Sequence, residues 1–211
     1  MSGEFMVKGH KATAERRQAL RKDLIEAADA RIAEEGLSAL TARLVAAEVG
    51  CSVGAIYNVF EDLGGLIIAV NSKTLARLDR EIAKILPAEQ DNQDPTESLV
   101  GIGLAYCRFA RKHLRLWSAL FEQGLKPDRV VPAWHMDEHV RLFTHVVTIL
   151  NKIAPDRSDE EVWSLARMMF SAVHGIVSLG MHDLFIAVPS DEIEQQVAIL
   201  LRSLVQGLFK T

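Results

Sequence analysis

Residues 40–60 constrain the fold of this chain more than any other part of its sequence. The segment reads LTARLVAAEVGCSVGAIYNVF. It contains two short stretches with apolar residues at helical spacing, and each stretch is preceded by a residue that can cap a helix. Thr41 can accept a hydrogen bond from an otherwise orphan backbone N–H at the start of the first stretch. Gly50 suits the left-handed conformation that ends a helix, and Ser52 caps the second stretch. The pattern predicts two short helices, at about 41–49 and 52–59, joined by a tight turn.

Both predicted helices have one apolar side at helical spacing. The residues expected on that side are Leu44, Val45, Val49, Val53, Ile56 and Phe60. The outward side of the second helix is small and polar, and consists of Gly54, Ala55, Tyr57 and Asn58. A helix with such a side can lie in the major groove of DNA. An ordinary helical hairpin inside an all-α core is the alternative.

The same segment resembles the DNA-binding motif of TetR-type transcriptional regulators. The resemblance rests on six residues in one frame, namely Thr41, Gly50, Ser52, Gly54, Tyr57 and Phe60. It covers about the first third of the chain well, and the remainder mainly by the layout of its helices. It implies a DNA-binding regulator that forms a homodimer on a palindromic operator.

Three positions depart from the pattern of that family. Val59 stands where the family often has a polar residue, and Leu63 stands where a Lys usually meets a phosphate. Cys51 replaces the usual Val, a mild change because a free Cys packs as a small hydrophobe. The second helix contains no Lys or Arg, so base reading would rest on Asn58, Tyr57 and apolar contacts with thymine methyl groups.

Basic residues gather near the start of the chain, although the net charge is −4. Opposed only by Glu15, they are Lys8, Lys11, Arg16, Arg17, Arg21 and Lys22. A basic arm beside a reading helix is the electrostatic footprint of a DNA-binding protein; for Lys8 and Lys11 a solubilising tail is the alternative. The predicted DNA-contacting residues are Arg16, Arg17, Thr41, Arg43, Ser52, Val53, Gly54, Ala55, Tyr57 and Asn58.

Helical periodicity extends over the rest of the chain. Further helices are expected at about 14–35, 62–86, 96–111, 114–124, 132–153, 158–182 and 190–208. No segment shows strand alternation, so the predicted class is all-α. We predict an N-terminal arm and three-helix helix-turn-helix DNA-binding domain over residues 1–61, and a C-terminal helical ligand-binding and dimerisation domain over 62–211. Thr96 and Ser190 are predicted to cap their helices, and Ser158 with Glu161 has the spacing of a capping box.

The last two predicted helices have wide apolar stripes. These stripes contain Val162, Leu165, Ala166, Met169, Val173, Ile176, Val177, Ile193, Val197, Leu200, Leu201, Leu204, Val205 and Leu208. Plain core packing would explain them. The resemblance implies instead that the two helices pair with their copies in a second subunit, with Leu201 at the contact. We therefore predict a homodimer through the last two helices.

Large aromatic side chains and histidines in the C-terminal part predict an apolar pocket for a small molecule. The predicted ligand-binding residues are Tyr106, Phe109, His113, Trp117, Phe121, Trp134, Phe143, Phe170 and His174. Trp163, Phe170, His174 and Ser178 lie near one helix face, at spacings of seven, four and four. Residues 170–179 look like a His-Gly motif in one branch of TetR C-terminal domains. For any single residue in this set, ordinary core packing is the alternative.

One short motif points to different chemistry. His135, Glu138 and His139 fit the H-x-x-E-H pattern of some zinc peptidases. Two histidines four residues apart share a helix face, as metal ligands do. No other feature supports a peptidase, so we predict no catalytic residue, no metal and no cofactor, and keep metal binding as an alternative.

Composition places the chain among proteins of the reducing cytoplasm. Cys51 and Cys107 are the two cysteines, without the spacing of a metal site or a disulfide framework. The first twenty residues lack the apolar run of a signal peptide, and no uninterrupted apolar stretch has the length of a membrane span. Residues 1–5 resemble a vector-derived scar and are left out of the fold prediction.

These features together predict a one-component transcriptional regulator. We expect a repressor that binds double-stranded operator DNA and is released by a small-molecule effector. Gly64 and Gly65, at the predicted domain junction, suggest the hinge. The alternative is a small-molecule-binding or metal-binding helical protein whose DNA binding is weakened, because Val59 and Leu63 depart from the family pattern.

Overall fold

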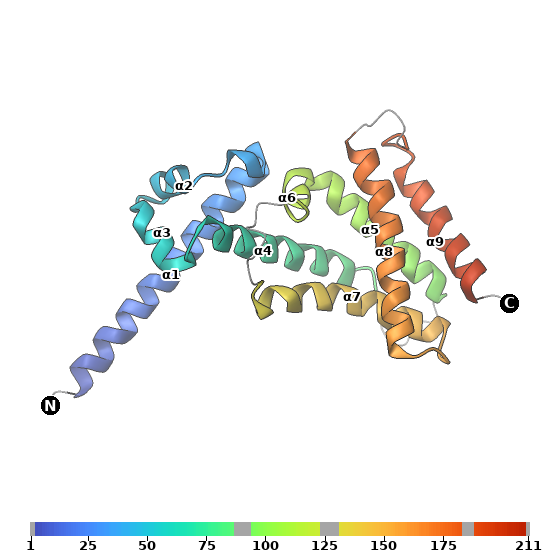
Figure 1. The fold of residues 1–211 in the computed structure, drawn as a ribbon, viewed down its shortest axis with the longest axis horizontal. Helices are drawn as coiled ribbons and strands as arrows, with labels where there is room; N and C mark the ends of the chain where they lie inside the picture. The colour runs from blue at the N-terminus through green and yellow to red at the C-terminus, as the bar shows by residue number, and fades with distance from the viewer. Residues whose placement is uncertain (1–2, 87–93, 123–130, 183–187, 210–211) are drawn as a thin grey trace. The chain divides into compact units, whose positions relative to one another are not determined.

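The structure is a computed structural model that describes residues 3–86, 94–122, 131–182 and 188–209, with side chains from Thr13 onward. Within these ranges the chain forms α-helices and one short 3-10 helix, without strands (Figure 1), which confirms the predicted all-α class. The elements are α1 (Gly3–Glu35), η1 (Leu37–Ala39), α2 (Ala42–Val49), α3 (Val53–Phe60), α4 (Leu63–Ala83), α5 (Pro95–Lys112), α6 (Leu114–Ala119), α7 (Ala133–Ile153), α8 (Asp159–Met181) and α9 (Ile193–Phe209).

The chain divides into two compact units. The first, here called the head, comprises Met1–Thr74 and Arg115–Val130, and the second, the body, comprises Leu75–Leu114 and Val131–Thr211. Helix α4 therefore begins in the head and ends in the body. This division by packing falls later than the predicted domain boundary after residue 61. The reason is that the first turns of α4 carry buried leucine, isoleucine and valine side chains into the core of the head.

The core of the head forms where α1 meets α2, α3 and the start of α4. Leu24, Ala28 and Ile32, spaced four residues apart along α1, are fully buried. Val45 of α2 and Ile56 of α3 are also fully buried in the same core. Burying whole aliphatic side chains in this way stabilises a fold by about 1.5–3 kcal/mol each. The helix-turn-helix is thus held by its inward side.

Leu44 does not lie on the buried side of α2, contrary to the prediction. Its side chain is 42% exposed, whereas Ala42 and Ala46 are buried beside Val45. An eight-residue helix that rests on α1 through small residues can approach it closely, and residue 44 is then turned about 100° away from Val45. Apolar spacing alone did not distinguish Leu44 from the alanines that make this contact.

In the body, α5 packs against α9 and α7, and α8 packs against α9 and α7. The approach of α9 to α5 is close at Gly103, where an added Cβ would lie 2.7 Å from a methyl carbon of Leu201. Leu201 is 4% exposed, and Ile193, Val197 and Val205 are buried with it. The prediction that Leu201 lies at a contact between subunits is therefore wrong, because this stripe of α9 packs inside its own chain.

Helix ends in the body follow local capping chemistry, although not always at the predicted residue. The predicted capping box at the start of α8 is confirmed: the Glu161 N–H donates to Ser158 Oγ at 3.4 Å, and Ser158 N–H donates to Glu161 Oε2 at 2.9 Å. Asp94, not Thr96, caps α5, since its carboxylate accepts from the Thr96 N–H at 2.8 Å. Helix α9 begins at Ile193, so the predicted cap at Ser190 is wrong.

Candidate nucleic-acid interface and effector site

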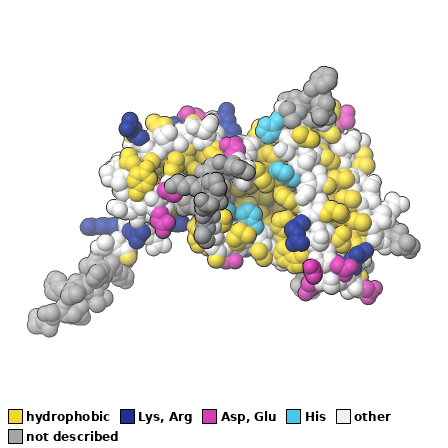
Figure 2. All heavy atoms as spheres, viewed as in Figure 1, with side chains coloured by type: hydrophobic (Ala, Val, Ile, Leu, Met, Phe, Trp, Pro, Cys, Tyr) yellow, Lys and Arg dark blue, Asp and Glu magenta, His cyan; other side chains and the backbone are white. Residues whose placement is uncertain are grey.

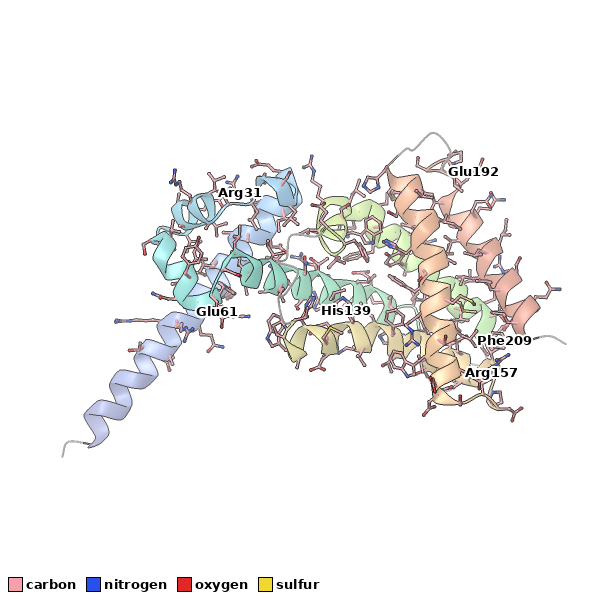
Figure 3. All side chains as sticks on the ribbon, in the orientation of Figure 1. Arg31, Glu61, His139, Arg157, Glu192 and Phe209 are labelled. Atoms are coloured by element: carbon pink, nitrogen blue, oxygen red, sulfur yellow. The ribbon has the colours of Figure 1, made fainter. Side chains whose placement is uncertain are left out.

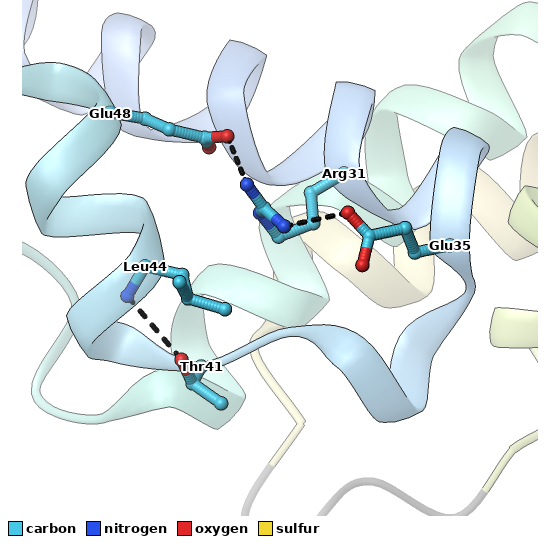
Figure 4. A network of polar contacts seen from close by, with 5 residues as sticks. All are labelled: Arg31, Glu35, Thr41, Leu44 and Glu48. Atoms are coloured by element: carbon cyan, nitrogen blue, oxygen red, sulfur yellow. Dashed lines mark hydrogen bonds and ion pairs between the residues drawn. The ribbon is translucent and has the colours of Figure 1, made fainter.

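The turn between α2 and α3 forms by the predicted local interactions. Thr41 Oγ1 accepts a hydrogen bond from the Leu44 N–H at 3.3 Å (Figure 4), and Ser52 Oγ accepts one from the Ala55 N–H at 3.2 Å. Gly50 adopts φ 73°, a left-handed conformation that a side chain would strain. Each helix of the pair therefore has its end fixed by a side chain or a glycine, and their relative orientation is set by the short turn.

An ion pair ties α2 to α1 on the outside of the head. The Arg31 guanidinium contacts the Glu48 carboxylate of α2 and donates to Glu35 Oε1 at 2.7 Å (Figure 4). Its side chain bridges one turn of its own helix and the neighbouring helix. This bridge adds a polar connection to the apolar contact on the inward side, so α2 is held to α1 from two sides.

The outward side of α3 is available to a partner. Tyr57 is 47% exposed, and Gly54 and Asn58 are also exposed, while Ile56 on the opposite side is fully buried. Among the other predicted contact residues of this helix, Ala55 is half-buried and Val53 is half-buried against the core of the head. The outward side of α3 thus presents the phenol of Tyr57, the amide of Asn58 and, at Gly54, a position without a side chain.

Exposed arginines lie on the two neighbouring helices. Arg16 of α1 and Arg43 of α2 are exposed. Arg17 is also exposed, but its Nη2 donates to the backbone carbonyl of Asn58 at 2.7 Å. The predicted arm residues Lys8 and Lys11 have side chains outside the described residues. Sequence reasoning counted Arg17 only as a DNA contact and did not foresee its hydrogen bond to α3.

Four of the nine predicted effector-site residues meet in the body. Tyr106 Oη lies 2.8 Å from His174 Nδ1, which joins α5 to α8. The Phe170 ring stacks on the His174 ring at 5.6 Å between centroids, and contacts the Phe143 ring edge-on at 5.4 Å. Trp163, whose spacing of seven from Phe170 was noted in the sequence, completes the group by stacking on Phe143 at 6.2 Å. We call these five side chains the aromatic cluster.

Burial gives the polar edge of the aromatic cluster its chemistry. It lowers the pKa of His174, because desolvation disfavours the charged imidazolium. The imidazole is therefore neutral at pH 7 and has one donor nitrogen and one acceptor nitrogen. Paired with the Tyr106 hydroxyl, it can accept a hydrogen bond from a ligand hydroxyl or donate one to a ligand oxygen.

Four of the other predicted ligand residues pair with each other. Phe109 and His113 pair with each other at 4.9 Å near the end of α5. Trp117 and Phe121 pair at 5.4 Å in the stretch after Arg115 that packs with the head. Trp134 is 44% exposed at the start of α7. Large side chains alone could not predict which of these residues the fold would bring together.

The H-x-x-E-H motif lies on α7 (Figure 3, which labels His139). His139 Nδ1 lies 3.1 Å from the carbonyl of His135, one turn earlier, so that this ring nitrogen is committed to its own helix as a donor. Burial, and second the neighbouring His139, lowers the pKa of His135 to about 4. Within the described ranges, no group of three or more His, Cys, Asp or Glu side chains is placed to hold a metal ion.

Comparison with known families agrees with this geometry. The model of bacterial regulatory proteins of the tetR family matches residues 24–70, which contain the helix-turn-helix, and the model of tetracyclin repressor-like C-terminal domains matches residues 99–204. Together the two models cover the greater part of both the head and the body. No curated protein matches the chain at a significant level.

Solved structures share the fold at low sequence identity. A protein with unknown function from Rhodococcus sp. RHA1 has a TM-score of 0.69 and 22% identity, over 90% of this chain and 96% of that chain. A TetR transcriptional regulator from Rhodococcus sp. RHA1 has a TM-score of 0.61 and 16% identity, over 92% and 99%. RolR in complex with resorcinol has a TM-score of 0.66 and 19% identity, over 90% and 89%. With a capped helix-turn-helix in the head and family matches over both units, the chain belongs to the tetR family of bacterial regulatory proteins and is a DNA-binding transcriptional regulator.

Proposed function

We propose that this regulator represses transcription as a cytoplasmic homodimer and leaves its operator when an aromatic effector binds to the body. The observation that carries the proposal is the orientation of α3. Its apolar side is fully buried at Ile56, while Gly54, Tyr57 and Asn58 face outward. A short capped helix with a small polar outer side suits the major groove.

The proposed DNA surface contains the residues predicted from the sequence except Arg17, whose side chain bonds the Asn58 carbonyl. Gly54, Tyr57 and Asn58 provide the exposed side of α3, and Arg16 and Arg43 provide positive charge beside it. The proposal further includes Thr41, Ser52, Val53 and Ala55 at the starts of α2 and α3, where backbone N–H groups favour an anion. Phosphate contacts position such a protein on DNA, whereas contacts to base edges give sequence preference.

Homodimer formation is proposed through a side of α8 and α9 that differs from the predicted one. Met168 and Leu179 of α8 are 42% and 43% exposed, and Ile199 of α9 is 49% exposed. In Figure 2 hydrophobic side chains run over these two helices. By length and composition alone, helix α8 is apolar enough to cross a membrane. Only 28% of its most apolar 18-residue stretch is buried within the chain. A second copy of the same surface would cover this exposed apolar side.

The proposed effector is a small aromatic molecule that carries a hydroxyl group. The aromatic cluster offers ring faces and edges from Phe143, Trp163 and Phe170, and a hydrogen-bonding pair from Tyr106 and His174. An apolar site with a few convergent polar groups is the usual composition of a small-molecule pocket. The complex of RolR with resorcinol supports this class of ligand by analogy of fold.

Helix α4 is proposed to transmit the effector signal, because it belongs to both units. On the head side, Asn71 Nδ2 donates to the Ala119 carbonyl at 3.3 Å, and Lys73 contacts Glu26 and lies 3.5 Å from Asp29 Oδ2 of α1. The predicted hinge residues Gly64 and Gly65 lie within the head unit. We therefore propose that α4 flexes near Thr74, where the two units divide, and changes the spacing of the two heads.

Operator selection tests the DNA-binding proposal. The wild-type protein is incubated with a random duplex library, and the enriched duplex is compared with a shuffled duplex of equal composition at several salt concentrations. We expect preference for a palindrome whose half-sites lie about one helical turn apart. The logarithm of the affinity should fall linearly with the logarithm of the salt concentration, and this salt slope should be about −0.9 per neutralised phosphate. If no duplex is enriched, or if affinity does not depend on salt, the alternative of a helical binding protein without DNA function is preferred.

Thermal shift and calorimetry test the effector proposal. Resorcinol and phenol serve as probes, with cyclohexanol as the non-aromatic control. The variant His174→Phe retains an aromatic ring at this position but cannot form the hydrogen bond to Tyr106. We expect an aromatic alcohol to bind the wild-type protein, to bind His174→Phe more weakly, and to weaken operator binding. Linkage requires DNA to lower the affinity for the alcohol by the same factor. A probe that binds equally well with and without operator would show that the cluster is not a sensor.

A further inference from the structure

The end of the recognition helix α3 depends on two arginines of α1. Arg17 Nη2 donates to the Asn58 carbonyl at 2.7 Å, and the Arg21 guanidinium lies over the Phe60 ring at 5.3 Å from its centroid. Both arginines are exposed and lie one turn apart on α1. They contact Asn58 and Phe60, two residues apart in the last turn of α3.

This last turn has backbone groups that need external partners. The final carbonyls of a helix have no intrahelical donor. In α3 the Tyr57 carbonyl accepts from the Glu61 N–H at 3.0 Å and the Phe60 carbonyl accepts from the Asp62 N–H at 2.7 Å. Arg17 satisfies the Asn58 carbonyl between them. Its positive charge also lies at the end of the helix where the macrodipole favours a cation.

The residue that ends α3 makes this support more important. Glu61, labelled in Figure 3, has φ 65° and ψ −47°, a positive-φ γ-turn conformation that a residue other than glycine adopts at a cost. Such strain persists where the surrounding structure determines the conformation. Phe60, immediately before it, is buried against the core of the head and covered by Arg21. The two arginines therefore hold the last turn of α3 immediately before this strained residue.

We propose that Arg17 and Arg21 are positioning residues that fix the recognition helix, and that neither acts chiefly as a phosphate contact. This inference rests on the proposed DNA-binding side of α3 and assigns it a determinant of sequence preference. Tyr57 and Asn58 lie in the turn that Arg17 holds, so loss of Arg17 lets the base-reading side chains move. The neighbouring Arg16 is the matched control, because it is also exposed and the described structure gives it no protein partner.

A phosphate contact and a positioning contact have different signatures. Removing a phosphate contact weakens binding to all duplexes and reduces the salt slope by about 1. Removing a positioning contact weakens binding to the preferred duplex and leaves the slope unchanged. Arg17→Gln is expected to lower affinity for the selected duplex about tenfold and for a shuffled duplex less than about twofold. Arg16→Gln is expected to lower both equally and to reduce the slope.

A second measurement needs no DNA and separates this inference from the proposed function. Hydrogen exchange of the free full-length protein reports the opening of the last turn of α3 at the Glu61 and Asp62 amides. Arg17→Gln and Arg21→Gln are expected to accelerate exchange there, while Arg16→Gln leaves it at the wild-type rate. Exchange at the wild-type rate in Arg17→Gln, or equal loss of affinity for both duplexes with a reduced salt slope, would overturn the assignment.

Discussion

The head and the body specify their helices in different ways. In the head, Thr41, Gly50 and Ser52 fix the ends of α2 and α3 through contacts within a few residues. In the body, the wide stripe of α9 has apolar residues on several sides, and the close approach to Gly103 of α5 selects which of them are buried. Local chemistry thus determines the reading helices, whereas distant packing determines what α8 and α9 leave exposed.

The largest expected effect contrasts one leucine from each unit. Leu201→Ala removes a buried side chain that packs near Gly103, and should lower the free energy of unfolding by about 2–5 kcal/mol. Leu44→Ala, at a 42% exposed position of α2, should change it by less than about 0.5 kcal/mol. Urea unfolding at one protein concentration measures both. Equal effects would show that burial does not separate the two positions.

A second test uses pH to examine the body. All histidines with described side chains lie in the body, and burial lowers the pKa of His135 to about 4. Folding therefore favours the neutral ring. The contribution of neutral His135 to the free energy of unfolding is fully present above pH 6.5. As the pH falls from 6.5 to about 4, the free energy of unfolding should decrease by up to about 3 kcal/mol. His135→Gln should flatten this part of the stability profile. A variant that loses as much stability as the wild-type protein over this range would contradict the prediction.

A third test addresses the side of α9 that packing inside the chain leaves free. Ile199→Glu places a charge on the 49% exposed position, so the dimer should dissociate at micromolar concentration. Two coupled heads then act singly, and operator affinity should fall about 100-fold. Asn151→Glu, on the exposed side of α7, is the control and should remain dimeric. Analytical ultracentrifugation measures both. A variant that stays dimeric would exclude Ile199 from the interface.

The sequence predicted correctly those features that depend on contacts between residues close together in the chain. The caps of α2, α3 and α8 and the left-handed Gly50 were predicted because each involves residues at most three apart. The exposure of Leu44 and the burial of Leu201 were missed, because both depend on which neighbouring helix contains small residues. Trp163 was recognised by its spacing but left out of the predicted set, since spacing does not reveal its partner Phe143 on α7.

The same limit applies to the candidate sites. Tyr57 was predicted to face outward because Ile56 and Phe60 occupy the inward positions of a short helix, and the structure confirms this. The meeting of Tyr106 with His174 joins residues far apart in the chain. No periodicity within either helix determines that contact. The hydrogen bond of Arg17 to α3 was missed for the same reason.

Substitution of Tyr57 tests most directly the central claim that the outward side of α3 binds DNA while its inward side maintains the fold. Tyr57→Phe removes one hydroxyl from a 47% exposed side chain, and should weaken binding to the selected duplex by about 1 kcal/mol, more if its acceptor is a phosphate. The melting temperature, measured on the same preparation, should stay at the wild-type value. A large fall in melting temperature with DNA affinity intact would place Tyr57 in the core and contradict the account.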